Sequence, residues 1–366
     1  MRKVRIGFVG VGNISGTYLK NLTTLFRDIE IAGVCDLIRE RAETAAETYR
    51  IPKVYDDMYA LFADPDVDIV LNITQAYNHY AVTKAALEYG KNVYSEKPLA
   101  PTFEQAKELF DLAQSRGLLL GGAPDTFMGA GIQSARRYID AGLIGTPLGA
   151  EARMITHGPE SWHPDPAAFY QPAAGPMLDM GPYYVTTLIN LLGRVDRVAG
   201  MARASFPERV AGCEQRRGER IPVDVPTHVN GILSFENGAV AHLLTTFDVY
   251  HPQHSAVEIY GSEGTLFVPN PNNFSGEIQL RRGNEDAVLP LLYGYRENVR
   301  GLGLADMARG LLTGRERRAD GVQQLHVVEV MTGILRASEE ERTVKITTPF
   351  ERRAPMAAGL PAGMLD

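Results

Sequence analysis

The sequence predicts an α/β fold: an N-terminal Rossmann domain with a doubly wound parallel sheet, then a C-terminal α+β domain with a large, mostly antiparallel open sheet. Three observations support this prediction. Short apolar runs alternate with segments of helix length over the first third of the chain, a glycine-rich turn follows the first run, and alternating apolar and polar residues dominate after about residue 195. A chain of 366 residues also suits two domains, at roughly 150 residues per domain.

Residues 1–122 form the expected Rossmann domain. Strands separated by helices imply parallel strands joined by right-handed crossovers, and unbroken apolar strands are expected where helices cover both faces of a sheet. The expected strands are VRIGFVG, IEIAGVCD, VDIVLNIT, KNVY and LLLGG.

Residues 123–350 form the expected second domain. Helices are predicted over IQSARRYIDAG and MGPYYVTTLINLLG, and a proline-rich loop over 159–176 lies between them. From Val195 to about Leu289 the alternation predicts an antiparallel sheet with one apolar face and one wetter face.

The chain ends with two further predicted helices, near 299–312 and 321–337, a short strand and a tail over 351–366. The tail has too few large apolar residues for a core of its own. We therefore expect it to be a strap, an oligomer arm or a disordered segment.

Composition excludes several classes of protein. Hydrophobic residues make up 45% and charged residues 22% of the chain, which is typical of a folded globular protein. The formal net charge is −7 and the sequence contains no long block of like charges, so neither nucleic acid nor an anionic membrane is expected as the main partner. The N-terminus has no apolar signal segment, and we expect a cytoplasmic protein whose partner is a small molecule.

We expect no metal centre. The two cysteines, Cys35 and Cys213, are far apart and belong to no CxxC pair, which favours free thiols in a reducing compartment. His251 and His254 offer two possible ligands, but Pro252 between them opposes a helical presentation and no partner ligand is evident.

The glycine-rich turn predicts a dinucleotide site. Gly10 and Gly12 follow the first expected strand, where the first glycine of the fingerprint permits a tight turn and the second lets a pyrophosphate approach the backbone. The third position of the fingerprint is Ser15, so the pattern is imperfect, although a small serine still permits close packing. Asn13 and Ile14, which open the following helix, are the other expected contacts of this turn.

Asp36 ends the second expected strand, 20 residues beyond Gly16, where a carboxylate can accept hydrogen bonds from the adenosine ribose. A carboxylate repels a 2′-phosphate, so NAD is favoured, while the nearby Arg39 keeps NADP possible. The alternative is that Asp36 simply caps the following helix.

Thr74, Asn78 and His79 follow the third expected strand at the carboxyl edge of the sheet, where ligands collect in open α/β folds. We expect them to contact the cofactor. His79 could equally cap the next helix or fill a polar niche.

Glu96-Lys97-Pro98 follows the fourth expected strand at the same edge. Lys97 could reach the nicotinamide and, partly removed from water, exchange a proton near neutral pH, while Glu96 orients the loop through backbone amides. By itself this tripeptide is equally compatible with a salt-bridged turn.

Several stretches together resemble the Gfo/Idh/MocA family, named after glucose-fructose oxidoreductase, inositol dehydrogenase and the rhizopine-catabolism protein MocA. The resemblance extends over nearly the whole chain and rests on GFVGVGNIS, VCD at Asp36, NIT followed by His79, KNVYSEKPLA, AAGPMLDMG and IYGSEGTLFV.

The resemblance implies that Lys97 and a later Asp-x-x-x-Tyr pair, Asp179 and Tyr183, line the substrate site facing the nicotinamide. The spacing of this pair puts both side chains on one face if the segment is helical. Two schemes remain open: Lys97 takes the hydroxyl proton directly, or Tyr183 takes it while Lys97 stabilises the phenolate. Asp179 would hold a substrate hydroxyl, or would only cap the helix.

The proline-rich loop contains Trp162 and His163, whose rings suit a sugar but would also suit an oligomer contact. Asp125, after the last Rossmann strand, is a further expected substrate contact, or else faces the nicotinamide.

The resemblance implies an NAD(P)-dependent oxidoreductase that oxidises a secondary hydroxyl of a sugar, cyclitol or sugar derivative, or reduces the ketone. The alternatives are an NAD-dependent glycosidase acting by transient oxidation and elimination, and a non-catalytic nucleotide-sensing protein. Relatives pair their open sheets, so a homo-oligomer, a dimer or tetramer, is expected through the C-terminal sheet.

Overall fold

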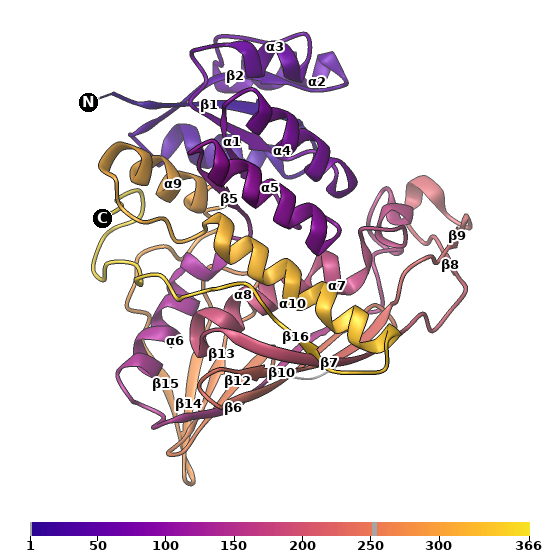
Figure 1. The fold of residues 1–366 in the computed structure, drawn as a ribbon, viewed down its shortest axis with the longest axis vertical. Coiled ribbons are helices and arrows are strands. Elements are labelled where there is room, and N and C mark those ends of the chain that lie inside the picture. The colour runs from indigo at the N-terminus through magenta and orange to yellow at the C-terminus, as the bar shows by residue number, and fades with distance from the viewer. Residues whose placement is uncertain (1, 251–254) are drawn as a thin grey trace. The chain divides into compact units, whose positions relative to one another are not determined.

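The structure, a computed structural model, describes residues 2–250 and 255–366 (Figure 1). His251 and His254, weighed above as metal ligands, lie outside the described residues. The chain divides into two compact units. Unit 1 comprises Met1–Gln133, Leu292–Leu325 and Arg353–Asp366, and unit 2 comprises Ser134–Leu291 and His326–Arg352. The domain boundaries at 122 and 350 stay a prediction.

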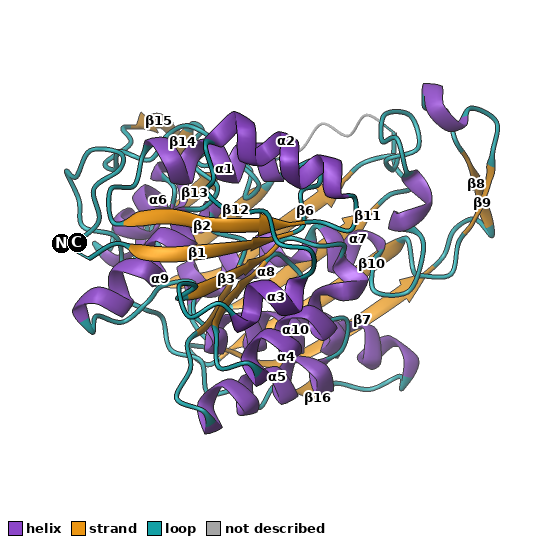
Figure 2. Ribbon diagram, turned by 90° about the horizontal axis from the view of Figure 1, so that it is seen from above, coloured by secondary structure: helices purple, strands orange, loops and turns teal. Residues whose placement is uncertain are grey.

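Unit 1 contains the predicted parallel sheet. Within the described residues this sheet has five strands in the order β2-β1-β3-β4-β5, and every neighbouring pair is parallel. Figure 2 shows β1, β2 and β3 side by side. The strands are β1 (Val4–Val9), β2 (Ile29–Cys35), β3 (Ile69–Asn72), β4 (Asn92–Ser95) and β5 (Leu120–Gly122).

The helices of unit 1 connect these strands. The chain passes from β1 to β2 in one direction along the sheet and from β3 through β4 to β5 in the other, so right-handed connections place α1 on one face and α4 and α5 on the opposite face. The helices are α1 (Ser15–Thr24), α2 (Arg39–Tyr49), α3 (Met58–Ala63), η1 (Ala76–Asn78), α4 (His79–Glu88), α5 (Phe103–Ser115), η2 (Thr126–Met128) and α9 (Leu302–Thr313).

Unit 2 is built on the predicted open sheet. Its nine strands, counted over the described residues, run in the order β15-β14-β13-β12-β6-β11-β10-β7-β16, and β6 with β11 is the parallel pair in an otherwise antiparallel sheet. The strands are β6 (Pro147–Ile155), β7 (Val195–Arg203), β10 (His228–Phe235), β11 (Val240–Thr246), β12 (Val257–Gly261), β13 (Thr265–Val268), β14 (Ile278–Arg282), β15 (Glu285–Leu289) and β16 (Val344–Lys345).

Helices cover one face of the large sheet. α8 (Gly181–Leu192) is buried along its whole length, as expected for a helix with few polar residues. The part of α10 (Gly321–Glu339) in unit 2 packs directly on β7 and β10, because a Cβ on Gly200 or Gly231 would lie within 2.7 Å of Ile334. The remaining helical segments along the chain are α6 (Ala130–Asp140), η3 (Pro166–Phe169), α7 (Gly175–Asp179) and η4 (Glu214–Arg216).

A short hairpin, β8 (Glu208–Val210) with β9 (Arg220–Pro222), projects from the large sheet in both ribbon views (Figures 1 and 2). Arg209 fixes it from inside, since its guanidinium contacts Glu160 and lies 3.1 Å from Asp248. Both acids lie outside the hairpin, so the ion pairs tie its base to the rest of unit 2.

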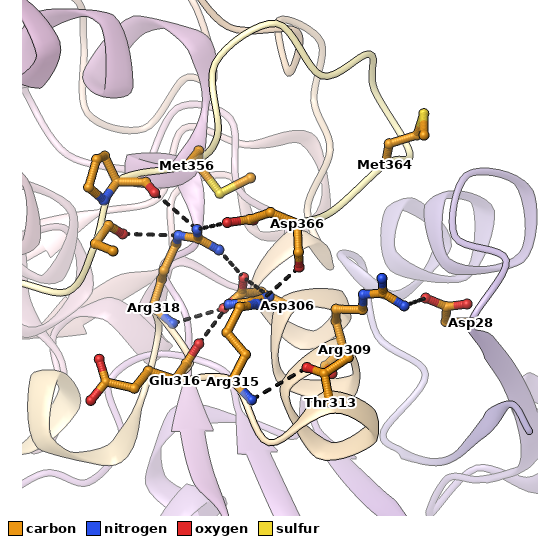
Figure 3. Close-up of polar contacts among 12 residues, drawn as sticks. Asp28, Asp306, Arg309, Thr313, Arg315, Glu316, Arg318, Met356, Met364 and Asp366 are labelled. Carbon is orange, nitrogen blue, oxygen red and sulfur yellow. Dashed lines mark hydrogen bonds and ion pairs between the residues drawn. The ribbon is translucent and has the colours of Figure 1, made fainter.

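The tail is a strap within unit 1. The Arg318 guanidinium donates to the carbonyls of Ala354 and Pro355 at 3.1 and 3.0 Å and to the Asp366 carboxylate at 2.7 Å. The same guanidinium donates to the buried Asp306 at 2.6 Å (Figure 3). These hydrogen bonds compensate for the small apolar content of the tail.

Within the described residues, no helix combines the length and apolar character that crossing a bilayer requires.

Candidate functional site

The glycine turn of unit 1 has the shape that a pyrophosphate needs. Gly10 has φ +96°, and a Cβ there would lie 2.8 Å from the Ile73 carbonyl oxygen, so glycine is required. A Cβ on Gly12 would meet nothing within 4 Å, which leaves open space beside the start of α1. The N-cap residue Ile14 makes no side-chain cap, and the N–H groups of Ser15 and Thr17 donate to the carbonyls of Gly12 and Ile14 at 3.1 and 3.2 Å. An anion at this helix start would share these N–H groups with the backbone.

Asp36 holds the turn together. Its Oδ2 accepts the Val11 N–H at 2.6 Å, and its Oδ1 accepts the Ile38 N–H at 2.8 Å. Asp36 therefore orders the residues just before α2, as the capping alternative requires in part. It is not the N-cap residue itself, which is Ile38. Each carboxylate oxygen can accept a further hydrogen bond.

Arg39 is committed to other partners. Its guanidinium lies 2.8 Å from Glu43 and 2.5 Å from Asp56. A 2′-phosphate would have to compete with two carboxylates for this side chain.

Leu37 and Ile38 are two further candidates that sequence reasoning missed. Leu37 is fully exposed and Ile38 is exposed, directly after Asp36. The detectable signal was an apolar pair where the second strand had ended and the helix had not begun.

Asn72 organises the loop after β3, and it too was missed as a site residue. Its Nδ2 donates to the His79 carbonyl at 3.1 Å and to Thr83 Oγ1 at 3.0 Å, while its Oδ1 accepts the Thr74 hydroxyl at 2.8 Å. This buried amide therefore positions Thr74 and the start of α4. Asn78, the N-cap residue of α4, is half-buried beside them.

His79 is buried rather than presented at the surface. Its Nδ1 lies 2.8 Å from the Pro98 carbonyl oxygen and its Nε2 lies 3.0 Å from the Thr74 carbonyl oxygen. The ring thus joins the loop after β3 to the loop after β4, which is the polar-niche alternative. A direct cofactor contact stays a prediction.

The loop of Lys97 is anchored through Glu96. Tyr18, on α1, donates its hydroxyl to Glu96 Oε1 at 2.6 Å, and Glu96 Oε2 accepts the Lys97 backbone N–H at 2.9 Å. Glu96 orients the loop through a backbone amide, as expected, and Lys97 is half-buried.

Asp125 caps the start of α9, although the two are far apart in the sequence. Its buried Oδ2 accepts the N–H groups of Gly301 and Gly303 at 2.8 and 3.1 Å. Burial raises the pKa of Asp125 to about 6, and the charge of Glu96 acts in the same direction. Its role as a substrate contact stays a prediction.

A cavity of about 710 Å³ lies within unit 2 at the end of the sheet where β6 and β13 finish and β12 and β14 begin. Two of the predicted substrate residues, Trp162 and Asp179, line it. Its aromatic lining is completed by Phe169, Tyr184, Phe247 and Phe267.

The polar lining of this cavity includes two hydroxyl residues, Thr156 and Ser255, and the carboxylate and amide side chains of Asp179, Asn270, Asn272, Glu277 and Gln279. None of the described residues that line this cavity is a lysine or an arginine. Sequence reasoning missed the four polar residues after β13 because no motif marks them.

Asp179 and Tyr183 do not share one helix. α7 ends at Asp179, Met180 follows, and α8 begins at Gly181, so the prediction of one continuous helical face is wrong. Pro182 lies in the first turn of α8, which explains why a new helix begins there. The N-cap residue of α8 is Met180, one residue after Asp179. Tyr183 is buried in that first turn.

His163 packs beside the cavity wall. Its ring contacts Trp162 and Phe169 at centroid distances of 5.3 and 4.7 Å, and its Nδ1 accepts the Asp165 N–H at 3.1 Å. It therefore supports two of the aromatic residues that line the cavity.

Two family models match the chain. One, the oxidoreductase family with an NAD-binding Rossmann fold, matches residues 4–122, and the other, the GFO/IDH/MocA C-terminal domain, matches residues 132–267. The chain belongs to the Gfo/Idh/MocA oxidoreductase family.

Relatives within this family act on cyclitols and sugars. Inositol 2-dehydrogenase/D-chiro-inositol 3-dehydrogenase of Lacticaseibacillus casei is 33% identical over 42% of this chain and 44% of its own length. scyllo-Inositol 2-dehydrogenase (NAD(+)) of Bacillus subtilis is 24% identical over 79% of this chain and 80% of its own. The chain spans about half the length of the first of these and of inositol 2-dehydrogenase of Salmonella typhimurium.

The structure of levoglucosan dehydrogenase in complex with NADH and levoglucosan has the same fold. Its TM-score is 0.80 at 22% identity, and the match covers 95% of this chain and 100% of the other.

The residues of this Gfo/Idh/MocA chain fit the dinucleotide that its Rossmann fold implies. Gly12 leaves room beside the start of α1, where no side chain of the N-cap residue intervenes, and Asp36 follows β2 with acceptor capacity to spare. The described residues contain no group of three His, Cys, Asp or Glu side chains that could hold a metal ion.

Proposed function

We propose that this protein is an NAD-dependent dehydrogenase that oxidises a secondary hydroxyl of a sugar, cyclitol or sugar derivative, or reduces the corresponding ketone. The observation that carries the proposal is the unit 2 cavity, in which Asp179 and amide side chains lie among aromatic rings. A polyhydroxylated ring offers hydroxyls at its rim and apolar C–H groups on its faces, so it complements such a lining. Membership of an NAD-binding oxidoreductase family supports the redox chemistry.

Three residues after β2 favour NAD over NADP. Asp36 would accept hydrogen bonds from the ribose hydroxyls, and Leu37 would cover the adenine. Arg39, which would otherwise favour a 2′-phosphate, is held by two carboxylates.

NAD, held at the glycine turn and by Asp36, would supply the acceptor for the hydride of the carbon that carries the hydroxyl. Lys97 takes the hydroxyl proton directly, or Tyr183 takes it while Lys97 stabilises the phenolate. A phenol has an unperturbed pKa of about 10, so the second scheme needs the cation. Asp179 accepts a hydrogen bond from a substrate hydroxyl. Lys97 belongs to unit 1 and the other two to unit 2, and their joint action is part of the proposal.

Lys97→Met tests the lysine. We expect NADH formation to fall by about a hundredfold or more, because general acid–base catalysis contributes at least this much. NAD binding, measured by calorimetry, should persist, since the glycine turn and Asp36 are untouched. Lys107→Met, at an exposed ion pair on α5, is the matched control and should retain activity. Unchanged turnover of Lys97→Met would remove the lysine from the mechanism.

A substrate panel separates this function from its alternatives. Purified protein with NAD or NADP is mixed with sugars, inositols and glycosides, and NADH release and products are followed. Stoichiometric NADH supports the dehydrogenase. Cleaved glycoside without net NADH supports the glycosidase, and NAD binding without turnover of any polyol supports the nucleotide sensor.

A further inference from the structure

A second cavity, of about 970 Å³, lies in unit 2 beside the β8–β9 hairpin. It is lined by residues that follow β6, among them His157, by Val249 and Tyr250, which follow β11, and by β8 itself. β6 and β11 are parallel neighbours, so the residues that follow them lie at the same end of the sheet. The cavity that contains Asp179 is at this end as well.

The two cavities share part of their lining. Ile155, Thr156 and Gly158 line both of them. A molecule held against Asp179 in the first cavity would reach the second by extending over these three residues. The first cavity alone has a volume typical of a site for a small ligand, so the second is additional space.

Aromatic and apolar side chains gather at the second cavity although they are exposed. Tyr250 is 68% exposed, Val210 58% and Phe206 45%. The Tyr250 ring stacks on His157 with 3.4 Å between centroids, which fixes it as a flat surface. Exposed apolar groups clustered around a hollow mark a binding surface more often than chance. A flat ring packs well on such a surface.

The charges around both cavities disfavour an anion. Asp179 and Glu277 line the first, and Glu160 and Glu208 line the second. Arg209 is the one arginine or lysine among the described lining residues of either cavity.

Four of the five N–H groups of Arg209 are already engaged. Its Nε donates to Glu160, one terminal nitrogen donates to Asp248 at 3.1 Å, and the other donates to the carbonyls of His157 and Phe247 at 2.7 and 2.9 Å. A phosphate or carboxylate would thus meet several carboxylates, and the one cation in the lining already uses most of its N–H groups within the protein.

We propose that the second cavity is a subsite for an uncharged ring attached to the sugar that is oxidised. The preferred substrate is then a neutral glycoside or disaccharide, and not a free monosaccharide, a sugar phosphate, a sugar acid or a nucleotide sugar. This inference rests on the proposed function. The hydride leaves the sugar carbon for NAD, the hydroxyl proton goes to Lys97 or Tyr183, and the glycosidic bond stays intact.

The test compares matched substrates on the full chain with NAD. For glucose, galactose and mannose, kcat/KM is measured for the free sugar, the phenyl glycoside, a disaccharide and the 6-phosphate. We expect the phenyl glycoside or disaccharide of at least one sugar to exceed the free sugar by about tenfold or more, as expected when an additional apolar ring is bound. The 6-phosphate should be the poorest. Equal or higher kcat/KM for the free sugars or phosphates would overturn the subsite.

A binding measurement separates this inference from the proposed function. Trp162, the single tryptophan of the chain, lines the first cavity, so its fluorescence reports binding without turnover. Glycosides that change the fluorescence at lower concentration than free sugars support the subsite even where no NADH forms. Oxidation of free sugars with no preference for glycosides in either measurement keeps the dehydrogenase and removes the subsite.

Tyr250→Ala and Tyr250→Phe locate the effect. Tyr250→Ala should lower the glycoside-to-free-sugar ratio of kcat/KM by about tenfold, close to the energy of one aromatic contact, and Tyr250→Phe should restore it. Leu148→Ala removes an exposed apolar side chain of β6 away from both cavities and is the matched control. An unchanged ratio in Tyr250→Ala would contradict the subsite.

Discussion

His79 shows how one buried side chain holds two loops of unit 1. Its ring lies between two carbonyl oxygens, those of Thr74 and Pro98. A neutral imidazole has a single N–H and can donate to only one of them. Burial lowers the pKa of His79 and Lys97 acts in the same direction, whereas both carbonyl contacts and Glu96 raise it. The pKa of His79 is lowered overall, so burial favours the neutral ring, which donates to one of the two carbonyls.

Asp125 gives a prediction about pH. Burial raises its pKa to about 6, against about 3.9 for an ordinary aspartate. Between about pH 4 and about pH 6 the folded protein therefore binds more protons than the unfolded chain, and this group makes the fold less stable as pH rises through that window. The size of the effect is about 2–3 kcal/mol.

Asp125→Asn keeps an oxygen for the N–H groups of Gly301 and Gly303 and cannot ionise. The free energy of unfolding of the variant relative to the wild type should rise by about 2–3 kcal/mol between about pH 4 and about pH 6. Urea denaturation at a series of pH values measures it, with Asp111→Asn at an exposed site as the control. A difference that stays constant with pH would mean that Asp125 does not titrate in this range.

At the level of elements, helix and strand periods were detectable in the sequence, but breaks between helices were harder to see. The spacing from Asp179 to Tyr183 suits one helix, yet Pro182 begins a new helix one residue after α7 ends. Proline is tolerated in the first turn of a helix and is also common where a helix begins. Pro182 was therefore consistent both with one continuous helix and with a new helix that begins beside it.

The packing of α10 on the sheet gives a prediction at this level. A Cβ on Gly200 would lie 2.5 Å from the Ile334 backbone oxygen, whereas a Cβ on Gly231 would meet the tip of the Ile334 side chain at 2.7 Å. Backbone cannot yield as a side chain can, so Gly200→Ala should destabilise the protein by about 1–3 kcal/mol and Gly231→Ala by less. Thermal and urea unfolding measure both. Equal losses would show that α10 shifts as a body instead.

For the whole molecule, the parallel sheet and the open sheet were predictable because each rests on signals within a few residues, such as the glycine turn. The cavities were not, because they assemble residues far apart in sequence. Asn270 and Gln279 reach the same space as Asp179 only through strand order. Asp125 likewise accepts a hydrogen bond from Gly301, which is 176 residues away in the sequence, and no sequence motif predicts this contact.

The uncovered face of the nine-stranded sheet gives the last prediction. Met201 and Ile232 are exposed on neighbouring strands, β7 and β10, beside a polar network in which His242 contacts Glu151 at 3.0 Å. Such a half-apolar face favours association of two copies, because burial removes the apolar area from water while the network pairs its own charges.

We expect light scattering to detect a homo-oligomer. Ile232→Lys should shift the equilibrium toward monomer, because association would bury an unpaired ammonium. Leu311→Lys, at an exposed position of α9, is the control. A wild-type monomer at all concentrations would contradict the expected oligomer.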